Sequence, residues 1–421
     1  MGVKIRPLKV VTSKGFPSTF FEWAGHSGYT RLMIKKKSVL NSTVIRLGLV
    51  SLFADISSEM LYPITPLFLT MTLGASMASV GFIEGLAEAF SSILKAYSGR
   101  WSDHLGKRKP FVWTGYLLAA IAKPLIGLAS TSGLVLFARC LDRTGKGLRS
   151  APRDALLGDS VSVSQRGAAF GWHRFMDTLG AVIGPLIAIL YLSFYPSNLR
   201  PIFIWAIIPG LLAVLISLTI SDIPSRAKEM VKRVAWNWKT IPVPFKRYLG
   251  GWILFSLVNS SDVFLLLVAK ERGVGTITVI LLYCFYNLSY ALLSPSLGAL
   301  SDRIGRKRCL QFGLLVFAAV YFGISLATTT LHFVLLFGVY GIYMAATDGV
   351  GKALALDLVD ESHKASALGL LATVTGLATL VASTVAGILW ERVSPSATFI
   401  YGAVGSLVAF VAISVLLKPK H

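Results

Sequence analysis

The chain alternates long apolar stretches with short polar segments from about residue 46 to residue 417. An α-helix needs about 20 apolar residues to cross the hydrocarbon core of a bilayer. Windows of this length predict twelve helices, at about 46–70, 79–101, 111–130, 133–157, 166–192, 201–221, 248–270, 276–300, 309–328, 331–355, 365–390 and 396–417. The pattern therefore predicts an all-α protein that crosses a membrane many times.

The composition also indicates a membrane protein. Only 14% of the residues are charged and 54% are hydrophobic, whereas a soluble domain contains about 25% charged residues. Charged residues are scarce along the whole chain, which argues against a soluble domain with a single membrane anchor. The three cysteines are far apart and have no spacing typical of disulfide frameworks or metal sites.

Basic residues are concentrated in the short segments between the apolar stretches. The net charge is +21, but this distribution is typical of cytoplasmic loops and argues against nucleic-acid binding. The segments GRWSDHLGKRKP, SDRIGRKR and KPKH fall on one side of the predicted helices, whereas TMTLGASMAS, on the other side, has no charged residue. We therefore expect both termini in the cytoplasm.

The predicted helices form two related sets of six. SGRWSDHLGKRK after the second helix resembles LGALSDRIGRKR after the eighth, which aligns Asp103 with Asp302. GDSVSVSQRGAAFG and LDLVDESHKASALG align Asp159 with Asp357. Two copies of a six-helix unit are the layout of a secondary transporter with a site between the halves. We predict a basic cytoplasmic tail 1–42, a first unit 43–221, a cytoplasmic linker 222–247, and a second unit with a short tail, 248–421.

Both copies of the duplicated loop resemble the G-x-x-x-D-x-x-G-[RK]-[RK] loop of the major facilitator superfamily. The resemblance covers about residues 45–417 and implies a transporter, rather than an enzyme, built from two pseudo-symmetric bundles of six transmembrane helices. We expect a monomer in the bilayer, with a small molecule and protons as its other partners. We assign to a cytoplasmic gate the loop residues Gly99, Asp103, Gly106, Lys107, Arg108, Gly298, Asp302, Gly305 and Arg306, together with Asp357.

Residues 142–160, DRTGKGLRSAPRDALLGDS, form a dense charge cluster at the end of the fourth helix. The segment is not a phosphate-binding loop, because it lacks the pattern G-x-x-x-x-G-K-[ST]. Arg139 opens a stretch similar to the family pattern R-x-x-x-G-x-G, with Arg143 in place of the first glycine. Helical spacing predicts one charged face with Arg139, Asp142, Arg143, Lys146 and Arg153. We add to the gate Asp142, Arg143, Lys146, Arg153 and Asp154. The alternative is basic anchoring with local ion pairs. Gly145, Gly147 and Pro152 are expected to let this helix end bend.

The fifth helix resembles the antiporter motif of drug exporters in the same superfamily. Gly171, Gly180, Gly184 and Pro185 have the spacing G-x8-G-x3-G-P, although the closing glycine pair is absent. The alternative is ordinary packing of small residues between helices. The motif implies efflux by proton antiport, in the cytoplasmic (inner) membrane of a bacterium.

Charged residues within the predicted helices mark a transport site, because a charge at the bilayer centre costs about 2.5–3.5 kcal/mol even on the most lenient scale. A proton carrier must change its charge in the working pH range, as a buried carboxylate or a histidine can. The proton-coupling candidates are Asp55, Glu59, Asp177 and His173. The substrate-cavity candidates are Tyr62, Glu84, Glu88, Arg139, Arg174, Asn259, Asp262, Asn287 and Tyr290. Some of these charges are expected to form structural ion pairs, such as Arg139 with an acid of the first or second helix.

The charge pattern leaves several functions open. The leading hypothesis is efflux of a small organic molecule, driven by the proton gradient and needing no cofactor. The basic residues of the fourth and fifth helices favour uptake or exchange of an anionic metabolite instead. The acids and His173 could bind a metal ion, but the nearby arginines argue against a dedicated cation site. A sensor built on a transporter fold is the least favoured hypothesis.

Overall fold

The computed structural model describes residues 41–162, 166–196, 198–222, 241–360 and 364–417. Within these residues all regular structure is helical. The predicted tail 1–42 lies almost entirely outside this part of the chain, as does most of the predicted linker.

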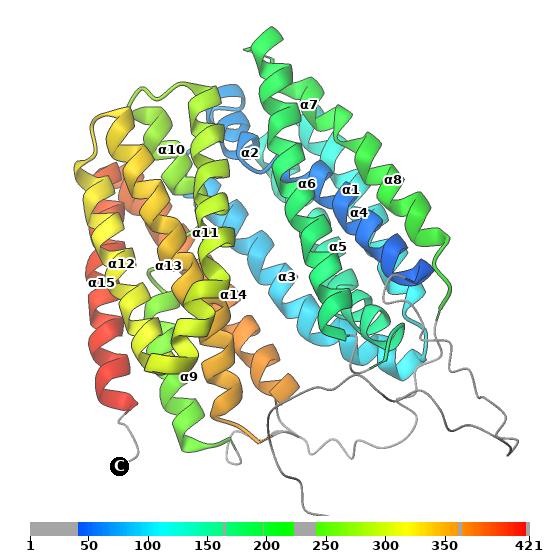
Figure 1. Ribbon diagram of the computed structural model, residues 1–421. Coiled ribbons are helices and arrows are strands. Elements are labelled where there is room, and N and C mark those ends of the chain that lie inside the picture. The colour runs from blue at the N-terminus through cyan, green and yellow to red at the C-terminus, as the bar shows by residue number, and fades with distance from the viewer. Residues whose placement is uncertain (1–40, 163–165, 197, 223–240, 361–363, 418–421) are drawn as a thin grey trace, which may run out of the picture. The chain divides into compact units, whose positions relative to one another are not determined.

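The described residues of the first half form nine helical elements, most of which are labelled in Figure 1. They are α1 (Ser42–Glu59), α2 (Ile64–Leu67), the π-helical turn η1 (Phe68–Thr72), α3 (Met77–Leu105), α4 (Lys109–Leu128), α5 (Ser132–Asp159), α6 (Arg166–Phe194), α7 (Arg200–Trp205) and α8 (Ile207–Leu218). The second half contains α9 (Val243–Ser256), α10 (Val263–Glu271), α11 (Thr276–Ile304), α12 (Arg306–Leu326), α13 (Thr330–Asp357), α14 (Lys364–Arg392) and α15 (Pro395–Leu416).

All twelve predicted stretches are helical, and nine of the described helical segments are long and apolar enough to cross a membrane. The other three stretches differ for physical reasons. The chain from α1 to η1 is interrupted near Pro63 and Pro66, and prolines remove backbone donors. The chain from α9 to α10 is interrupted at residues 257–262. Helix α5 is continuous but carries the charge cluster.

The two interruptions occupy corresponding positions, because α1–α2 opens the first half and α9–α10 opens the second. Broken helices in matching positions of a duplicated transporter point to its binding site. They place Glu59 at a helix end, and Asn259 and Asp262 in or beside a break. Asp262, predicted within the helix at 248–270, therefore lies directly before α10, at the end of the break.

The duplication predicted from the sequence is confirmed by the packing of the helices. In the first half α3 packs on α5, α4 on α8, and α1 on α8. The second half repeats these contacts as α11 on α13, α12 on α15, and α9 on α15. The side chains of Thr131 and Thr329 cap the equivalent helices α5 and α13. Each half is thus one copy of the same six-helix unit.

The two halves meet mainly along α3 and α14 (Figure 1). A Cβ atom built on Gly387 would lie 2.7 Å from the Cα atom of Ala78, and one on Gly376 would lie 2.5 Å from the Cβ atom of Ser92. By contrast, a Cβ atom on Gly369 would meet no atom within 4 Å. The halves are therefore in close contact toward the Gly387 end of α14 and separate toward its beginning.

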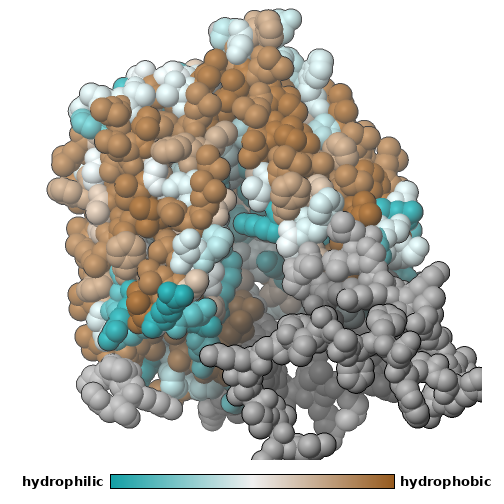
Figure 2. Space-filling model, viewed as in Figure 1, coloured by the Kyte–Doolittle hydropathy of each residue, from teal (hydrophilic) through white to brown (hydrophobic). Residues whose placement is uncertain are grey.

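We call the side on which α3 ends and α4 begins the basic side, because it carries the duplicated basic loops. Figure 2 shows hydrophobic residues over the upper surface of the helices and hydrophilic residues inside the hollow below, toward the basic side. On the opposite side, buried residues of α2 and α10 belong to one apolar cluster that joins the halves. Among the described residues, the two halves are therefore in contact on the opposite side and separate toward the basic side.

Candidate functional site

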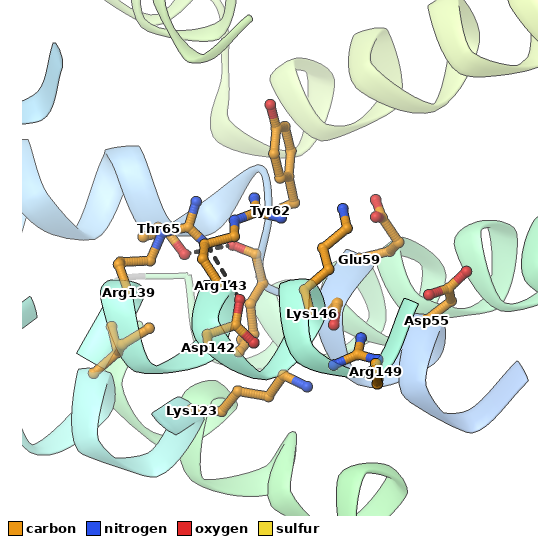
Figure 3. Close-up of a pocket in the computed structure, with 13 residues that line it drawn as sticks. Asp55, Glu59, Tyr62, Thr65, Lys123, Arg139, Asp142, Arg143, Lys146 and Arg149 are labelled. Atoms are coloured by element: carbon orange, nitrogen blue, oxygen red, sulfur yellow. Dashed lines mark hydrogen bonds and ion pairs between the residues drawn. The ribbon is translucent and has the colours of Figure 1, made fainter. Parts of the chain in front are cut away.

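A cavity of about 100 Å³ lies among α1, α4 and α5, where the broken first helix meets the charge cluster (Figure 3). Its uncharged lining residues are Ser58, Leu61, Tyr62, Thr65 and Ile126. Its charged lining residues are Asp55, Glu59, Lys123, Arg139, Asp142, Arg143, Lys146 and Arg149. Five of these eight charged side chains are basic, so the lining has an excess of positive charge.

Helix α5 supplies most of the charged lining. Asp142, Arg143 and Lys146 project from it into the cavity (Figure 3), and we had assigned them to the cytoplasmic gate. They lie in the middle part of α5, which continues to Asp159 at the basic side, and their role in the cytoplasmic gate stays a prediction. The helix does not loosen at its glycines. Gly145 packs against the backbone of α4, and Gly147 against that of α3.

Arg139 forms a buried ion pair with Glu84 of α3. The Nε atom of Arg139 donates to Oε1 of Glu84 at 2.9 Å, and Nη2 donates to Oε2. The two residues are only 6% and 5% exposed. Asp142 adds a longer contact at 3.9 Å to Arg139. The expected pairing of Arg139 with an acid of the first or second helix is confirmed, and this pair joins α5 to α3.

Two basic residues of the cavity were missed by the sequence analysis. Lys123 is 4% exposed and projects from α4. A lone lysine inside an apolar stretch, directly before Pro124, was a signal that could have identified it. Arg149 is also buried; it lies 4.3 Å from the centre of the Tyr116 ring and donates to the carbonyl of Gly115 at 3.4 Å. Helical spacing from Arg139 alone did not indicate that Arg149 would reach this cavity.

The two acids of α1 both line the cavity, but they differ in their partners. Glu59 accepts a hydrogen bond from the hydroxyl of Tyr283 in α11, and the Tyr283 ring stacks on Tyr62 at 5.0 Å. These contacts join the two halves. Asp55 has no hydrogen bond or ion pair within the part of the chain that the structure describes. Its electrostatic neighbours are Asp177, Glu59, Lys146 and Arg153.

The candidates on α6 lie beside α1 and outside the lining of this cavity. Asp177 accepts a hydrogen bond from Ser51. His173 lies 3.9 Å and Arg174 3.8 Å from the Asp177 carboxylate. Arg174 has a side chain that is 68% exposed, so its predicted place in a substrate cavity is not supported here. His173 is buried, and its Nε2 atom has no hydrogen-bond partner among the described residues.

The polar candidates of the second half are held by tyrosines and do not line this cavity. Asp262 accepts hydrogen bonds from Tyr286 at 3.0 Å and Tyr340 at 2.7 Å. Asn259 donates to Tyr343 at 3.1 Å. The second half therefore presents an aromatic cluster with paired polar groups.

Two further candidates, Asn287 and Tyr290, are also bound within their own half, and Glu88 lies beside basic residues of the first half. Asn287 donates to the carbonyl of Tyr283 at 2.9 Å, and Tyr290 donates to Asp348 at 3.0 Å. Glu88 is half-buried on α3, and its electrostatic neighbours include Arg143 and Lys146. Glu88 thus lies beside the cation cluster without lining the cavity.

The duplicated loops make equivalent contacts on the basic side. Gly106 and Gly305 have φ values of +65° and +97°, which favour glycine at both places. Arg108 forms an ion pair with Asp159 in the first copy. Arg306 forms one with Asp357 at 2.9 Å in the second. The alignment of Asp159 with Asp357 therefore corresponds to a repeated ion pair between each loop and the end of α5 or α13.

The remaining gate candidates make local contacts or are not described. Arg153 pairs with its neighbour Asp154 at 2.9 Å. Asp302 lies 3.4 Å from Arg306. A Cβ atom on Gly99 would contact Ala151, whereas one on Gly298 would meet nothing within 4 Å. The side chain of Asp103 lies outside the described residues. Among the described residues, the contacts seen for Lys146, Arg153 and Asp154 thus stay within the first half, and their predicted pairing with the second half stays a prediction.

The glycines of the predicted antiporter motif allow α6 to approach α1. A Cβ atom on Gly180 would lie 2.6 Å from the carbonyl oxygen of Leu52 and 2.9 Å from the Cβ atom of Asp55. One on Gly184 would lie 2.7 Å from the carbonyl oxygen of Ile56. Gly171, in contrast, has open space around it. Two of the three glycines therefore hold the backbone of α6 against the segment that carries Asp55.

Gly184→Ala is expected to lower the free energy of unfolding by about 1–3 kcal/mol, because the added methyl group would force apart two helix backbones. Gly171→Ala is the matched control, and it is expected to be neutral or slightly stabilising because alanine favours a helix. Thermal unfolding of both purified variants in detergent measures the difference. Equal melting temperatures for the two variants would show that close contact of α6 with α1 does not matter for stability.

Comparisons with known proteins agree with this architecture. The model of the Major Facilitator Superfamily matches residues 47–283 and 247–421. An uncharacterized MFS-type transporter of Methanocaldococcus jannaschii is 38% identical over 378 residues, which cover 88% of this chain and 94% of the relative. Multidrug resistance protein MdtH of Yersinia enterocolitica is 26% identical over 316 residues, 73% of this chain and 77% of that protein.

Solved structures agree at the level of the fold. The crystal structure of the nucleoside transporter NupG has a TM-score of 0.73 at 15% identity and covers 90% of this chain and 100% of its own. The duplicated loops, the two six-helix units and these matches lead to one assignment. The chain belongs to the Major Facilitator Superfamily and is a multi-pass membrane transporter.

Proposed function

We propose that this protein is a proton-coupled secondary transporter that moves a small polar organic molecule across the cytoplasmic membrane by alternating access. The observation that carries the proposal is the position of Asp55 and Glu59. Both carboxylates line a cavity whose other walls carry five basic side chains. The cavity also lies next to the contact between the two halves, where Tyr283 donates to Glu59.

A proton on either carboxylate would change the charge of the cavity and the contact between the halves together. Protonation of Asp55 removes a negative charge that faces Lys146. Protonation of Glu59 changes the group that accepts a hydrogen bond from the second half. A ligand or proton shifts a conformational equilibrium only through such differences in interaction between the two states. Coupling is thus proposed to arise at α1.

The orientation proposed for the membrane follows from the charge of the loops. The basic side carries the duplicated lysine- and arginine-rich loops, and such loops face the cytoplasm in membrane proteins. The hollow in Figure 2 would then open to the cytoplasm. Both chain termini would lie on the same side. A transporter in this conformation is ready to accept a molecule from inside the cell or to release one there.

Export remains the first candidate for the direction of transport. The packing of Gly180 and Gly184 against α1 gives the antiporter-like motif a structural role next to Asp55, and one relative is named a multidrug resistance protein. The size of the cavity limits what could be exported. At about 100 Å³ it is smaller than the roughly 300–1,000 Å³ of sites for drug-sized ligands. A small polar molecule fits better than a bulky apolar drug.

Uptake or exchange of an anionic metabolite is the second candidate, and the excess of basic side chains in the cavity favours it. An anion bound beside Asp55 and Glu59 would make it easier for them to take up a proton, because the two negative charges repel each other. By reciprocity, protonation would favour binding of the anion. Anion and proton would then move together. Transport of metal ions has no comparable support from the described residues.

Proton flux in proteoliposomes tests the proposal. Vesicles that contain the purified protein and a pH-sensitive dye are given an imposed pH gradient, and candidate solutes are added outside. We expect a solute-dependent collapse of the gradient that is absent from protein-free vesicles. The sign of the pH change distinguishes antiport from cotransport. Transport of a solute at the same rate with and without a pH gradient would contradict proton coupling.

A further inference from the structure

Some basic residues of the cavity have a close ion-pair, hydrogen-bond or aromatic partner, and others have none among the described residues. Arg139 is paired with Glu84, and Arg149 is held by Tyr116 and the carbonyl of Gly115. Lys123, Arg143 and Lys146 form no ion pair within 4.0 Å and no hydrogen bond among the described residues of the chain. All three line the same cavity. Figure 3 shows Arg143 and Lys146 on the side of α5 that faces Tyr62 and Glu59, and Lys123 on the other side of this helix.

Lys123 and Arg143 would be costly if the cavity served only as packing, whereas Lys146 is exposed to solvent. Lys123 is 4% exposed, and the Nε atom of Arg143 is fully buried without a hydrogen-bond partner among the described residues. A buried cation destabilises a protein unless a counter-charge and hydrogen bonds compensate for it. Clusters of this kind are common where a protein binds a charged ligand. Asp142 is an electrostatic neighbour of Lys123, and Glu88 is one of Arg143, but neither acid forms an ion pair within 4.0 Å with them. A closer counter-charge is therefore best sought in the ligand.

We propose that Lys123, Arg143 and Lys146 form the binding site for an anionic group of the substrate, and that the substrate is a small organic acid. This inference rests on the proposed transport function. The guanidinium of Arg143 can hold two oxygens of one carboxylate or phosphate group, while each lysine adds a compact positive charge. Lys123 comes from α4 and the other two residues from α5, so a bound anion would bridge the two helices.

The two acids of α1 also line the cavity, so acidic and basic side chains lie in the same lining. Asp55 and Glu59 carry the opposite charge, and Asp55 has Lys146 as an electrostatic neighbour. The anionic group of a substrate would compete with these carboxylates for the same cations. In this proposal the substrate anion binds the cations of α4 and α5, and the proton binds a neighbouring carboxylate of α1. Carboxylate and phosphate monoester share the required chemistry, and the experiment below distinguishes them.

The test is ligand-dependent thermal stability of the full-length protein in detergent, followed by tryptophan fluorescence. The probes are inorganic phosphate, acetate and succinate, compared with sodium chloride and choline chloride at equal ionic strength. We expect phosphate or a carboxylate to raise the melting temperature of the wild type beyond the effect of the chlorides. Arg143→Gln is expected to weaken the apparent affinity for that anion about tenfold to hundredfold, as loss of a charged hydrogen bond does.

Lys123→Met is the second variant, because it keeps the length of the side chain and removes a buried charge. Without ligand it should melt no lower than the wild type, which separates loss of binding from loss of folding. It should nevertheless lose most of the anion-dependent shift. Lys352→Gln is the matched control, since this exposed lysine of α13 pairs with Asp348 at 2.6 Å. Its anion-dependent shift should equal that of the wild type.

Three results would overturn the anion site. They are an equal shift in Arg143→Gln, Lys123→Met and the wild type, a shift with choline alone, and no shift with any anion in the wild type. The measurement needs neither a membrane nor a pH gradient. A negative result here would therefore contradict the anion site and not proton coupling. A negative result in the flux experiment would contradict proton coupling and not the anion site.

Discussion

Replacing Arg139 by alanine is expected to lower the free energy of unfolding by about 3–5 kcal/mol, the range measured when one partner of a buried ion pair is removed. The change would leave Glu84, which is 5% exposed, without its counter-charge and without the two hydrogen bonds that it now accepts. It would also remove the link between α5 and α3. Thermal or denaturant unfolding of the purified variant in detergent measures the loss.

A double-mutant cycle identifies the cause. Arg139→Met combined with Glu84→Leu replaces both charges by apolar side chains of similar size, and it should recover much of the stability lost in either single variant. Lys352→Ala is the control, because the pair of Lys352 with Asp348 is solvent-exposed and such pairs contribute about 0–1 kcal/mol. If Arg139→Ala were as mild as Lys352→Ala, the buried pair would have no special role in stability.

The fold was predictable because its signals are local or repeated. A stretch of about 20 apolar residues specifies a membrane helix without knowledge of its neighbours. The alignment of Asp159 with Asp357 indicated a repeated feature. Each of these residues forms an ion pair with the duplicated basic loop of its own half. The pairing of Arg139 with an acid of the first two helices followed from the cost of an unpaired buried charge.

The candidate site was only partly predictable, because its contacts join residues far apart in sequence. The partner of Glu59 is Tyr283, which lies 224 residues further along the chain. Helical spacing showed that Asp142, Arg143 and Lys146 share a face, but it could not show at what depth that face meets another helix. Lys123 belongs to α4, whereas the other cations of the cavity belong to α5. The spacing of residues within α5 therefore could not predict that Lys123 lies beside them.

The structure also separates proton-coupling candidates that the sequence left equal. Asp177 is held by Ser51 and lies within 4 Å of His173 and Arg174, so favourable contacts stabilise its charge. Asp55 has no such partner among the described residues, and it lies in the cavity beside Glu59. A group that must gain and lose a proton during each cycle should not be held in one state by fixed partners. Asp55 is therefore the first choice.

Asp55→Asn is expected to abolish solute accumulation driven by a pH gradient. A gradient of one pH unit is worth about 1.4 kcal/mol per proton, which supports about a tenfold accumulation of a solute coupled to one proton. The variant should bring the solute only to equal concentrations on both sides. Asparagine has nearly the shape of aspartate, so the contact of this side chain with Gly180 of α6 should be kept. Proteoliposomes with a radiolabelled solute measure accumulation directly.

Exchange without a gradient distinguishes lost coupling from lost binding. Because Asp55→Asn removes a negative charge and leaves Lys123, Arg143 and Lys146 in place, the variant should still exchange solute across the membrane at equal pH. Asp142→Asn is the matched control, since Asp142 lines the same cavity but has Arg139 as a partner at 3.9 Å. It should still accumulate solute. Accumulation by Asp55→Asn together with its loss in Asp177→Asn would move the proton site from α1 to α6.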